Sequence, residues 1–424
     1  MPGRQTFTSF PAALAVVLGF LAIVNPCAAQ REQVLYSFCS VQNCADGYWP
    51  VAGVVFDAGG NLYGTTPRGG TQGAGTVFEL TPERGGSWAE KTLYEFCSQT
   101  DCTDGAEPEA GLILDSAGNL YGTTMYGTVF ELTPGAGGTW SEKVLDNIGA
   151  GTYAGLIMDS AGNLYGTTVD GGAHNGGMVF ELSPGANGTW TEKVIHSFAA
   201  YRGDYESGAF GGVVFDGAGN LYGTVYGGGI DSDNCDYSGC GKVFELSPNA
   251  DGTWSEKTLH RFRGLPDGAN PWAGVVLDSA GNVYGATYSG GTGQCKNGNG
   301  NVVGCGVVFM LSPLENGQWS EKVLHSFDNN GFDGFSSFAG LALDAAGNLY
   351  GTTSAGGTRN SGTVFRVTKD SDGKWNERII YNFGRYADGA VPRADLVFGN
   401  DGKLSGTTLY GGEYGYGAVF QITP

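Results

Sequence analysis

One short phrase recurs along this chain and limits what it can fold into. Asn-Leu-Tyr-Gly-Thr-Thr occupies residues 61–66, 119–124, 163–168 and 348–353, and degenerate copies begin at residues 220, 282 and 403. Counted between their glycines, the seven copies lie 44 to 66 residues apart. A repeat of this length indicates an architecture in which each copy forms one structural unit.

Each unit contains four runs that look like β-strands. The first three are typified by residues 110–115, 120–124 and 127–132, and the fourth by residues 322–327. The runs are rich in β-branched and aromatic residues and are separated by Gly, Pro, Asn and Asp, which is typical of strands joined by turns. A Pro-x(5)-Trp linker precedes the fourth run, and no later segment shows helical periodicity.

Seven units of four antiparallel strands predict an all-β fold, a closed seven-bladed β-propeller. A β-solenoid is the competing repeat architecture. The two ends of the chain favour the propeller. The first run after the N-terminal segment, residues 33–38, is of the fourth type, whereas the last run, residues 417–422, is of the third type. We therefore expect the N-terminal strand to complete the last blade, a permutation that an open array has no reason to carry.

The full motif runs Leu-Tyr-Gly-Thr-Thr, Gly-Gly, Gly-Thr-Val-Phe-Glu-Leu-Thr-Pro and Val-Leu-x-Ser-Phe. It resembles the tandem Gloeobacter/Verrucomicrobia (GloVer) repeats of exported, β-propeller-like bacterial proteins, and the resemblance covers nearly the whole chain after the N-terminal segment. The resemblance implies export but little about activity, because the family is defined by its repeat. Many members carry a C-terminal anchoring segment. Here the sequence ends at Pro424, which favours a free secreted or periplasmic protein.

Residues 1–29 have the pattern of a secretory signal peptide. Arg4 supplies the positive start, residues 12–24 form the apolar segment, and Pro26 interrupts it. An N-terminal membrane anchor is the alternative, but the apolar run is shorter than the ~20 residues that a spanning helix needs. We therefore expect residues 30–424 to form a single propeller domain without a membrane span.

The cysteines agree with export. Apart from Cys27 they form four close pairs: Cys39/Cys44, Cys97/Cys102, Cys235/Cys240 and Cys295/Cys305. An even number of cysteines in local pairs predicts disulfide bonds in an exported chain. A zinc site is the rival interpretation for the closest spacings, but no histidines are placed to complete it.

Composition and charge narrow the classes of partner. Glycine accounts for 76 of the 424 residues, but hydrophobic residues at 41% and aromatic residues at 12% allow the chain to bury a core. The formal net charge of −20 disfavours a nucleic-acid partner, because an acidic surface repels phosphates. We expect a monomer whose partner is a glycan or an extracellular protein.

The site is expected on one face of the propeller. In such a fold the loops from fourth to first strands and from second to third strands share a face, and here these loops carry nearly all the length variation and all four cysteine pairs. Variable loops on a rigid scaffold are where function concentrates.

Two groups of aspartates on that face are candidate ligands for a cation. Five precede glycine just before the innermost strands, where a ring of carboxylates around a channel mouth would suit a cation or a cationic ligand; they are Asp46, Asp104, Asp267, Asp333 and Asp388. The alternative is that Asp-Gly is repeated turn chemistry. Asp231, Asp233 and Asp236 have a spacing that partly suits calcium, the one cofactor we consider. Among the aromatic residues, Trp49, Trp272 and Tyr126 are candidates for stacking on a sugar or a protein partner.

The sequence does not select a reaction. It contains no nucleophile elbow, zinc-protease motif, phosphate loop or dinucleotide fingerprint. We therefore expect a non-catalytic glycan- or protein-binding module. The alternatives are a carbohydrate-active enzyme, hydrolase or lyase, that uses carboxylates of the same face, and a structural envelope protein.

Overall fold

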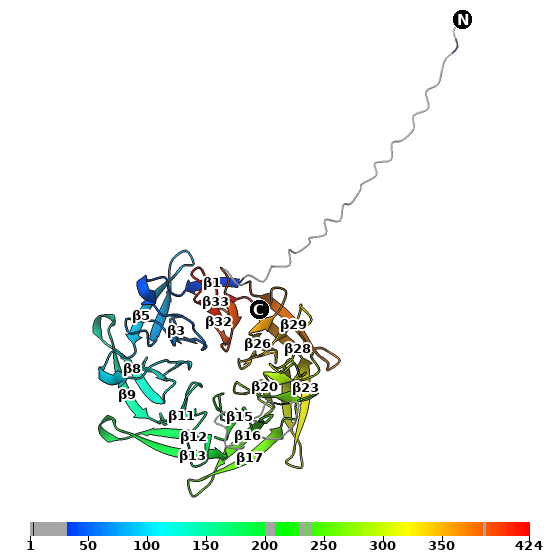
Figure 1. Ribbon diagram of the computed structural model, residues 1–424, viewed down its shortest axis with the longest axis horizontal. Coiled ribbons are helices and arrows are strands. Elements are labelled where there is room, and N and C mark those ends of the chain that lie inside the picture. Colours follow the sequence, from blue (N-terminus) through cyan, green and yellow to red (C-terminus); the bar gives the residue numbers. More distant parts are fainter. Residues whose placement is uncertain (1–2, 4–31, 200–207, 229–234, 236–238, 385–386) are drawn as a thin grey trace.

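Seven antiparallel sheets are arranged like blades around a central axis (Figure 1). The structure is a computed structural model that describes residue 3 and residues 32–199, 208–228, 235, 239–384 and 387–424. The predicted signal peptide therefore lies almost entirely outside the described residues. The sheets are not joined to one another by strand pairing, so the ring is held together by the packing of neighbouring blades.

Each blade has four strands that follow one another from the channel outward. The first blade contains β2 (Val55–Phe56), β3 (Leu62–Thr66), β4 (Thr76–Pro82) and β5 (Trp88–Glu95). The second contains β6 (Ile113–Leu114), β7 (Leu120–Thr123), β8 (Thr128–Pro134) and β9 (Trp140–Asn147). The third contains β10 (Ile157–Met158), β11 (Leu164–Thr167), β12 (Asn175–Pro184) and β13 (Trp190–Ala199).

The next three blades repeat this order. The fourth contains β14 (Val214–Phe215), β15 (Leu221–Val225), β16 (Lys242–Pro248) and β17 (Trp254–Arg261). The fifth contains β19 (Val276–Leu277), β20 (Val283–Ala286), β22 (Val307–Pro313) and β23 (Trp319–Ser326). The sixth contains β25 (Ala342–Leu343), β26 (Leu349–Thr353), β28 (Thr363–Lys369) and β29 (Trp375–Asn382).

The seventh blade joins the two ends of the chain. It contains β31 (Val397–Phe398), β32 (Leu404–Tyr410) and β33 (Ala418–Ile422), and its outer strand is β1 (Glu32–Ser37). β1 runs antiparallel to β33, with Glu32 opposite Ile422 and Ser37 opposite Ala418. The seven-bladed architecture and the role of the N-terminal strand are therefore confirmed, and the strand begins and ends one residue earlier than predicted.

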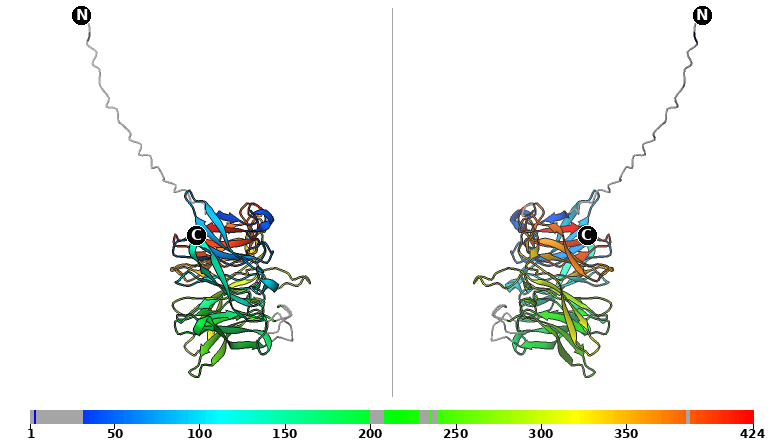
Figure 2. Two further views of the ribbon diagram at one scale, coloured as in Figure 1. Left: turned by 90° about the vertical axis from the view of Figure 1, so that its left-hand side faces the viewer. Right: turned by 90° about the vertical axis from the view of Figure 1, so that its right-hand side faces the viewer.

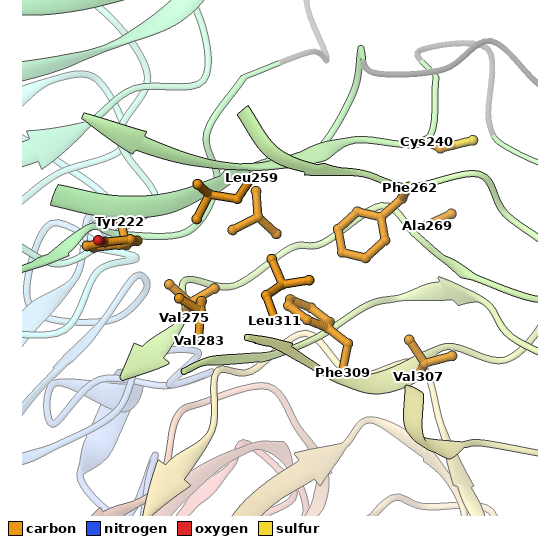
Figure 3. Packing of buried hydrophobic residues seen from close by; sticks show 11 residues of the cluster. Tyr222, Cys240, Leu259, Phe262, Ala269, Val275, Val283, Val307, Phe309 and Leu311 are labelled. Carbon is orange, nitrogen blue, oxygen red and sulfur yellow. The ribbon is translucent and has the colours of Figure 1, made fainter. Parts of the chain in front are cut away.

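Phenylalanine pairs hold neighbouring blades together. The residue that follows the fourth strand of one blade packs edge-on against a third-strand phenylalanine of the next. Phe38 and Phe78 have ring centroids 5.0 Å apart, and Phe262 and Phe309 have centroids 5.1 Å apart. Figure 3 shows the second pair among the buried side chains between blades four and five. Such pairs add specific geometry to the burial of apolar surface.

The glycine of the repeated phrase is required by this packing. A Cβ atom on Gly64 would lie 2.5 Å from Cζ of Phe78, which is far inside van der Waals contact. The glycine therefore makes room for the phenylalanine of the adjacent strand, and the phrase repeats because the packing repeats.

Helical structure is minor. Within the described residues the helices are four short 3₁₀ turns: η1 (Gln42–Cys44), η2 (Thr100–Cys102), η3 (Ala136–Gly138) and η4 (Ala186–Gly188). None of the helices in that part of the chain has the length and apolarity to cross a membrane.

The two variable sets of loops share one face, as expected. In blade five, β18 (Gly268–Ala269) precedes the first strand and pairs with β21 (Ser289–Gly290), which follows the second. β24 (Gly334–Phe335) and β27 (Ala355–Gly356) form the same pair in blade six, and β30 (Ala390–Pro392) pairs with the extended β32 in blade seven. Figure 2 shows the disc edge-on with its connecting loops on two faces.

All four predicted disulfide bonds are present. They join Cys39 to Cys44, Cys97 to Cys102, Cys235 to Cys240 and Cys295 to Cys305. The pairing supports the disulfide interpretation of these cysteines over the rival one as zinc ligands. Disulfide bonds form in oxidising compartments, so the bonds indicate an extracytoplasmic location.

Candidate functional site

A central cavity opens among the loops that lead into the first strands. Its volume is about 470 Å³, and all seven blades contribute to its wall. Each blade except the seventh supplies a short segment of the form x-Ala-Gly or x-Gly-Gly, and the seventh supplies Arg393-Ala394-Asp395. We call the first residue of each segment the mouth residue and the third the neck residue. Alternate residues of an extended chain point to the same side, so both belong to the lumen.

The mouth residues differ in chemistry from blade to blade. In chain order they are Val51, Glu109, Tyr153, Phe210, Trp272, Phe338 and Arg393, and all line the cavity. The residues around them repeat closely, since each is followed by a small residue, a neck residue and an apolar first strand. The mouth is therefore a place where the repeats keep one backbone and vary one side chain.

Four consecutive blades form an aromatic arc around the mouth. The rings of Phe210 and Trp272 are stacked, with their centroids 4.3 Å apart. On either side, the centroid of Tyr153 lies 5.4 Å from that of Phe210, and the centroid of Phe338 lies 5.1 Å from that of Trp272. The buried Tyr226 also packs against the arc, with its ring centroid 5.4 Å from that of Phe210. All four arc residues are partly exposed, so they present ring surface to the cavity.

Two of the other three blades supply charged mouth residues, Glu109 and Arg393, and the third supplies Val51. The guanidinium of Arg393 lies over the ring of Phe338, 4.6 Å from its centroid. In blade two, the pKa of the half-buried Glu109 is raised by desolvation and by the charge of Glu107, against the opposing charges of Arg68 and Arg393. Arg68 and Glu107 themselves form a two-bond ion pair, with N–O distances of 2.7 and 2.9 Å. The mouth thus combines stacking surface with groups of both signs.

Asp395 breaks the repeat at the neck. The other six blades have glycine there, at positions 53, 111, 155, 212, 274 and 340. Glycine suits the neck because neighbouring backbones approach closely: a Cβ atom on Gly274 would lie 2.6 Å from the carbonyl oxygen of Gly212. Oδ1 of Asp395 instead accepts a hydrogen bond from the backbone N–H of Gly340, at 2.5 Å.

The surroundings of Asp395 raise the pKa of its carboxyl group. Its side chain is exposed to the channel lumen, while protein atoms of the channel wall surround it. The resulting desolvation raises the pKa of Asp395, against the hydrogen bond from Gly340. A carboxyl group in this position favours a proton or a cationic partner more than an exposed aspartate does.

The five aspartates of the Asp-Gly segments lie elsewhere. None of them lines the cavity. Each contacts a tyrosine or histidine near the outer edge of its blade, and the pairs are Asp46–Tyr36 at 2.7 Å, Asp104–Tyr94 at 2.8 Å, Asp267–His260 at 3.1 Å, Asp333–His325 at 3.0 Å and Asp388–Tyr381 at 2.8 Å. The structure therefore does not gather them into a ring around the channel mouth, and their contacts fit the alternative interpretation as turn residues.

A glutamate of the next blade interacts electrostatically with each of these aspartates at the seam between blades. We call this set the seam glutamates: Glu32, Glu90, Glu142, Glu321 and Glu377. Burial raises the pKa of Glu32 to about 8, with a further contribution from Asp388. Burial likewise raises the pKa of Glu377 to about 7. At that seam, His325, Asp333 and Glu377 bring one ligand atom each within 4.8 Å, the one such group among the described residues.

The remaining candidates divide between cavity and loops. Trp272 lies in the aromatic arc. Trp49 is outside the cavity and packs against Tyr48 and Tyr410, with ring centroids 5.0 and 6.1 Å away. Tyr126 is 61% exposed and also lies outside the cavity. Asp231, Asp233 and Asp236, the proposed calcium ligands, fall outside the described residues.

Sequence reasoning missed Glu109, Arg393 and Asp395. Aligning the seven repeats by their first strands would have revealed these residues. At the neck position six repeats have glycine and one has Asp395, and at the mouth position, two residues earlier, the residue type differs between repeats. Motifs drew attention to residues that repeat, whereas the chemical variety of the cavity wall comes from residues that do not.

Comparisons with known proteins agree with the fold. The extracellular domain of a protein described as a hybrid two-component system from B. thetaiotaomicron superposes with a TM-score of 0.51 at 13% identity over 93% of this chain. This chain spans 41% of that one. An oxidoreductase described as a glucose dehydrogenase from Thermus thermophilus gives a TM-score of 0.42 at 18% identity, over 74% of this chain and 96% of that one, which is too low to bear on function.

Two sequence comparisons complete the assignment. No curated protein matches the sequence. The family model of the Gloeobacter/Verrucomicrobia repeat matches residues 18–141 and 233–424, well over half of the chain. With the repeated phrase, the seven blades and this match in agreement, the chain belongs to the Gloeobacter/Verrucomicrobia repeat family.

Proposed function

We propose that this chain is a secreted or periplasmic glycan-binding propeller whose site is the central cavity. One observation carries the proposal: the mouth residues vary in chemistry on a backbone that otherwise repeats. Packing alone explains residues that recur in every blade, but it gives no reason for Trp272, Glu109 and Arg393 at equivalent positions. A binding site requires such differences, because its contacts are specific to one ligand.

The cavity has the size and composition of a small-ligand site. About 470 Å³ falls within the range of ~300–1,000 Å³ that such sites occupy. The aromatic arc offers flat apolar surface for the C–H faces of sugar rings, and Glu109 and Arg393 offer acceptor and donor groups for hydroxyls. Arg393 already packs on Phe338, so its guanidinium is held at the edge of the site.

A glycan array with the purified protein tests the proposal, followed by titration of the best ligand. Trp272→Ala should weaken binding by about tenfold or more, as expected for a central aromatic contact. Tyr126→Ala is the matched control, because Tyr126 lies on the same face outside the cavity, and it should leave affinity unchanged. A silent array, or binding that survives Trp272→Ala with an unchanged melting temperature, would contradict the cavity as a glycan site.

Hydrolysis or elimination of the bound glycan is a second candidate function. It is favoured by two carboxyl groups, Glu109 and Asp395, that line one cavity and both have a raised pKa. A raised pKa is what a general acid needs near neutral pH. Product formation from an array ligand, lost in Glu109→Gln and in Asp395→Asn, would establish catalysis. Intact ligand after long incubation would leave binding alone.

A further inference from the structure

The neck carries a single side chain. Asp395 stands where the six other blades present a bare backbone, two residues past Arg393 and therefore further into the channel. Oδ1 of Asp395 accepts a hydrogen bond from the backbone N–H of Gly340, which is the neck residue of blade six. Any group that enters past the mouth residues meets this carboxyl group, which is reachable from the lumen.

The charges that line the cavity do not balance. Glu109 and Asp395 are acidic, and Arg393 is the basic residue on the wall. Arg68 and Glu107 interact with Glu109 from outside the cavity lining and neutralise one another through their ion pair. One carboxyl group therefore lacks a basic partner within the cavity, in a protein whose net charge is −20. A carboxyl group on the wall of a confined cavity, without a basic partner there, attracts a cation.

The aromatic arc suits the same kind of group. Aromatic faces attract cations through their electron-rich surfaces, and the guanidinium of Arg393 over Phe338 is such a contact within the site itself. Ammonium groups of a ligand in this cavity would meet both aromatic rings and carboxyl groups on its wall. An acidic sugar would instead meet two carboxyl groups, and a neutral sugar would leave Asp395 without a counter-charge.

We propose that the glycan bound in this cavity bears free amines, as in a polymer of 2-amino sugars, and that one of its ammonium groups pairs with Asp395. This inference rests on the proposed function and specifies its ligand class. An amine on the sugar distinguishes such a ligand from the acetylated form of the same polymer, which has the same rings and linkage without the charge.

The test compares these two forms by calorimetric titration. The probes are the β-1,4-linked tetramers of glucosamine and of N-acetylglucosamine, at about 0.15 M salt so that surface attraction is largely screened. The amine form should bind at least about tenfold more tightly. Asp395→Gly restores the residue found in the other six blades and should remove that preference, leaving affinity for the acetylated tetramer unchanged. Asp395→Asn, checked by melting temperature, serves the same purpose if the glycine variant unfolds.

Glu315→Gln is the control for overall charge. Glu315 is exposed in the linker between β22 and β23, outside the cavity, so this variant should keep the preference for the amine form. Equal or tighter binding of the acetylated tetramer would overturn the amine inference while glycan binding stands. A preference that survives in both Asp395 variants would also overturn it. If neither tetramer binds, the amine inference fails, and the glycan array decides separately whether the cavity binds another glycan.

Discussion

Val34 in β1 lies directly opposite Phe420 in β33, so the first strand of the chain is the outer strand of the last blade. Leu35 and Phe38 continue this contact into the core that blade seven shares with blade one. The ring therefore depends on a strand that comes from the far end of the chain.

Deleting residues 32–38 should open the ring and lower its stability sharply. The deletion removes the partner of β33 and the buried Phe38, whose loss alone is worth about 3–5 kcal/mol. Thermal and urea unfolding measure the effect. Gln33→Ala is the control, because Gln33 is exposed in the same strand. An unchanged melting temperature in the deletion variant would be incompatible with closure by β1.

Gly223→Ala should destabilise blade four by about 1–3 kcal/mol. A Cβ atom there would lie 2.7 Å from Cζ and 3.0 Å from Cε1 of Phe244, so the ring must shift. Gly217→Ala in the same blade is the matched control, since it has no atom within 4 Å and lies outside the left-handed backbone region. Equal melting temperatures for the two variants would show that the phenylalanine ring is not the reason for the glycine.

The seam glutamates should make the protein more stable in mild acid than in mild alkali. Desolvation raises the pKa of Glu32 to about 8 and that of Glu90, Glu142 and Glu377 to about 7. A carboxyl group with a raised folded-state pKa contributes stability below its ordinary value near 4.5, and this contribution is lost as the pH rises through 7 to 8. The melting temperature should therefore fall between about pH 5 and pH 8.5.

Two other kinds of titratable group, the turn aspartates and His196, lower the stability of the protein at acid pH. Hydrogen bonds outweigh desolvation and lower the pKa of the turn aspartates such as Asp115 and Asp344, whose contribution is lost below about pH 4. Burial lowers the pKa of His196, which opposes folding below its ordinary value near 6.5. Replacing Glu32, Glu90, Glu142 and Glu377 together by glutamine should flatten the fall above pH 5. A slope that persists in this variant would assign the effect to other groups.

Reduction of the disulfides should loosen loops without unfolding the ring. The bonds join cysteines only 5 or 10 residues apart, and none links two blades. Limited proteolysis of the reduced protein should therefore give new cuts within residues 39–44, 97–102 and 295–305, with circular dichroism unchanged at room temperature. Cuts within the strands, or loss of the β-sheet signal, would mean that the bonds support the fold as a whole.

The fold and the disulfides could be predicted because their signals are repeated. Seven copies of one strand pattern reinforce one another, and the mismatched types at residues 33–38 and 417–422 point to the shared blade. The disulfides could be predicted because the two cysteines of each pair lie close together in the sequence and far from the other pairs. These residue patterns are local, and in this protein each local preference agrees with the overall fold.

The site could not be placed in the same way. Asp46 and its equivalents precede the innermost strands in the sequence, which suggested the channel mouth. Their carboxyl groups instead turn outward to bond Tyr36, His260 and the related outer residues. Conversely, Glu109 and Arg393 look like ordinary surface charges until seven segments meet around one axis. The seven mouth residues come together only in the assembled ring, and the sequence of a single repeat does not show that they will meet.

The seven mouth residues can be exchanged as a set. Each lies in an equivalent segment of its own blade, outside the paired strands, so we expect the strands of the scaffold to tolerate a side chain grafted from one blade onto another. Moving the aromatic arc by one blade would rotate the recognition pattern about the axis of the disc. Because neighbouring mouth residues from Tyr153 to Arg393 also contact one another, such changes would have to be made in sets of adjacent blades.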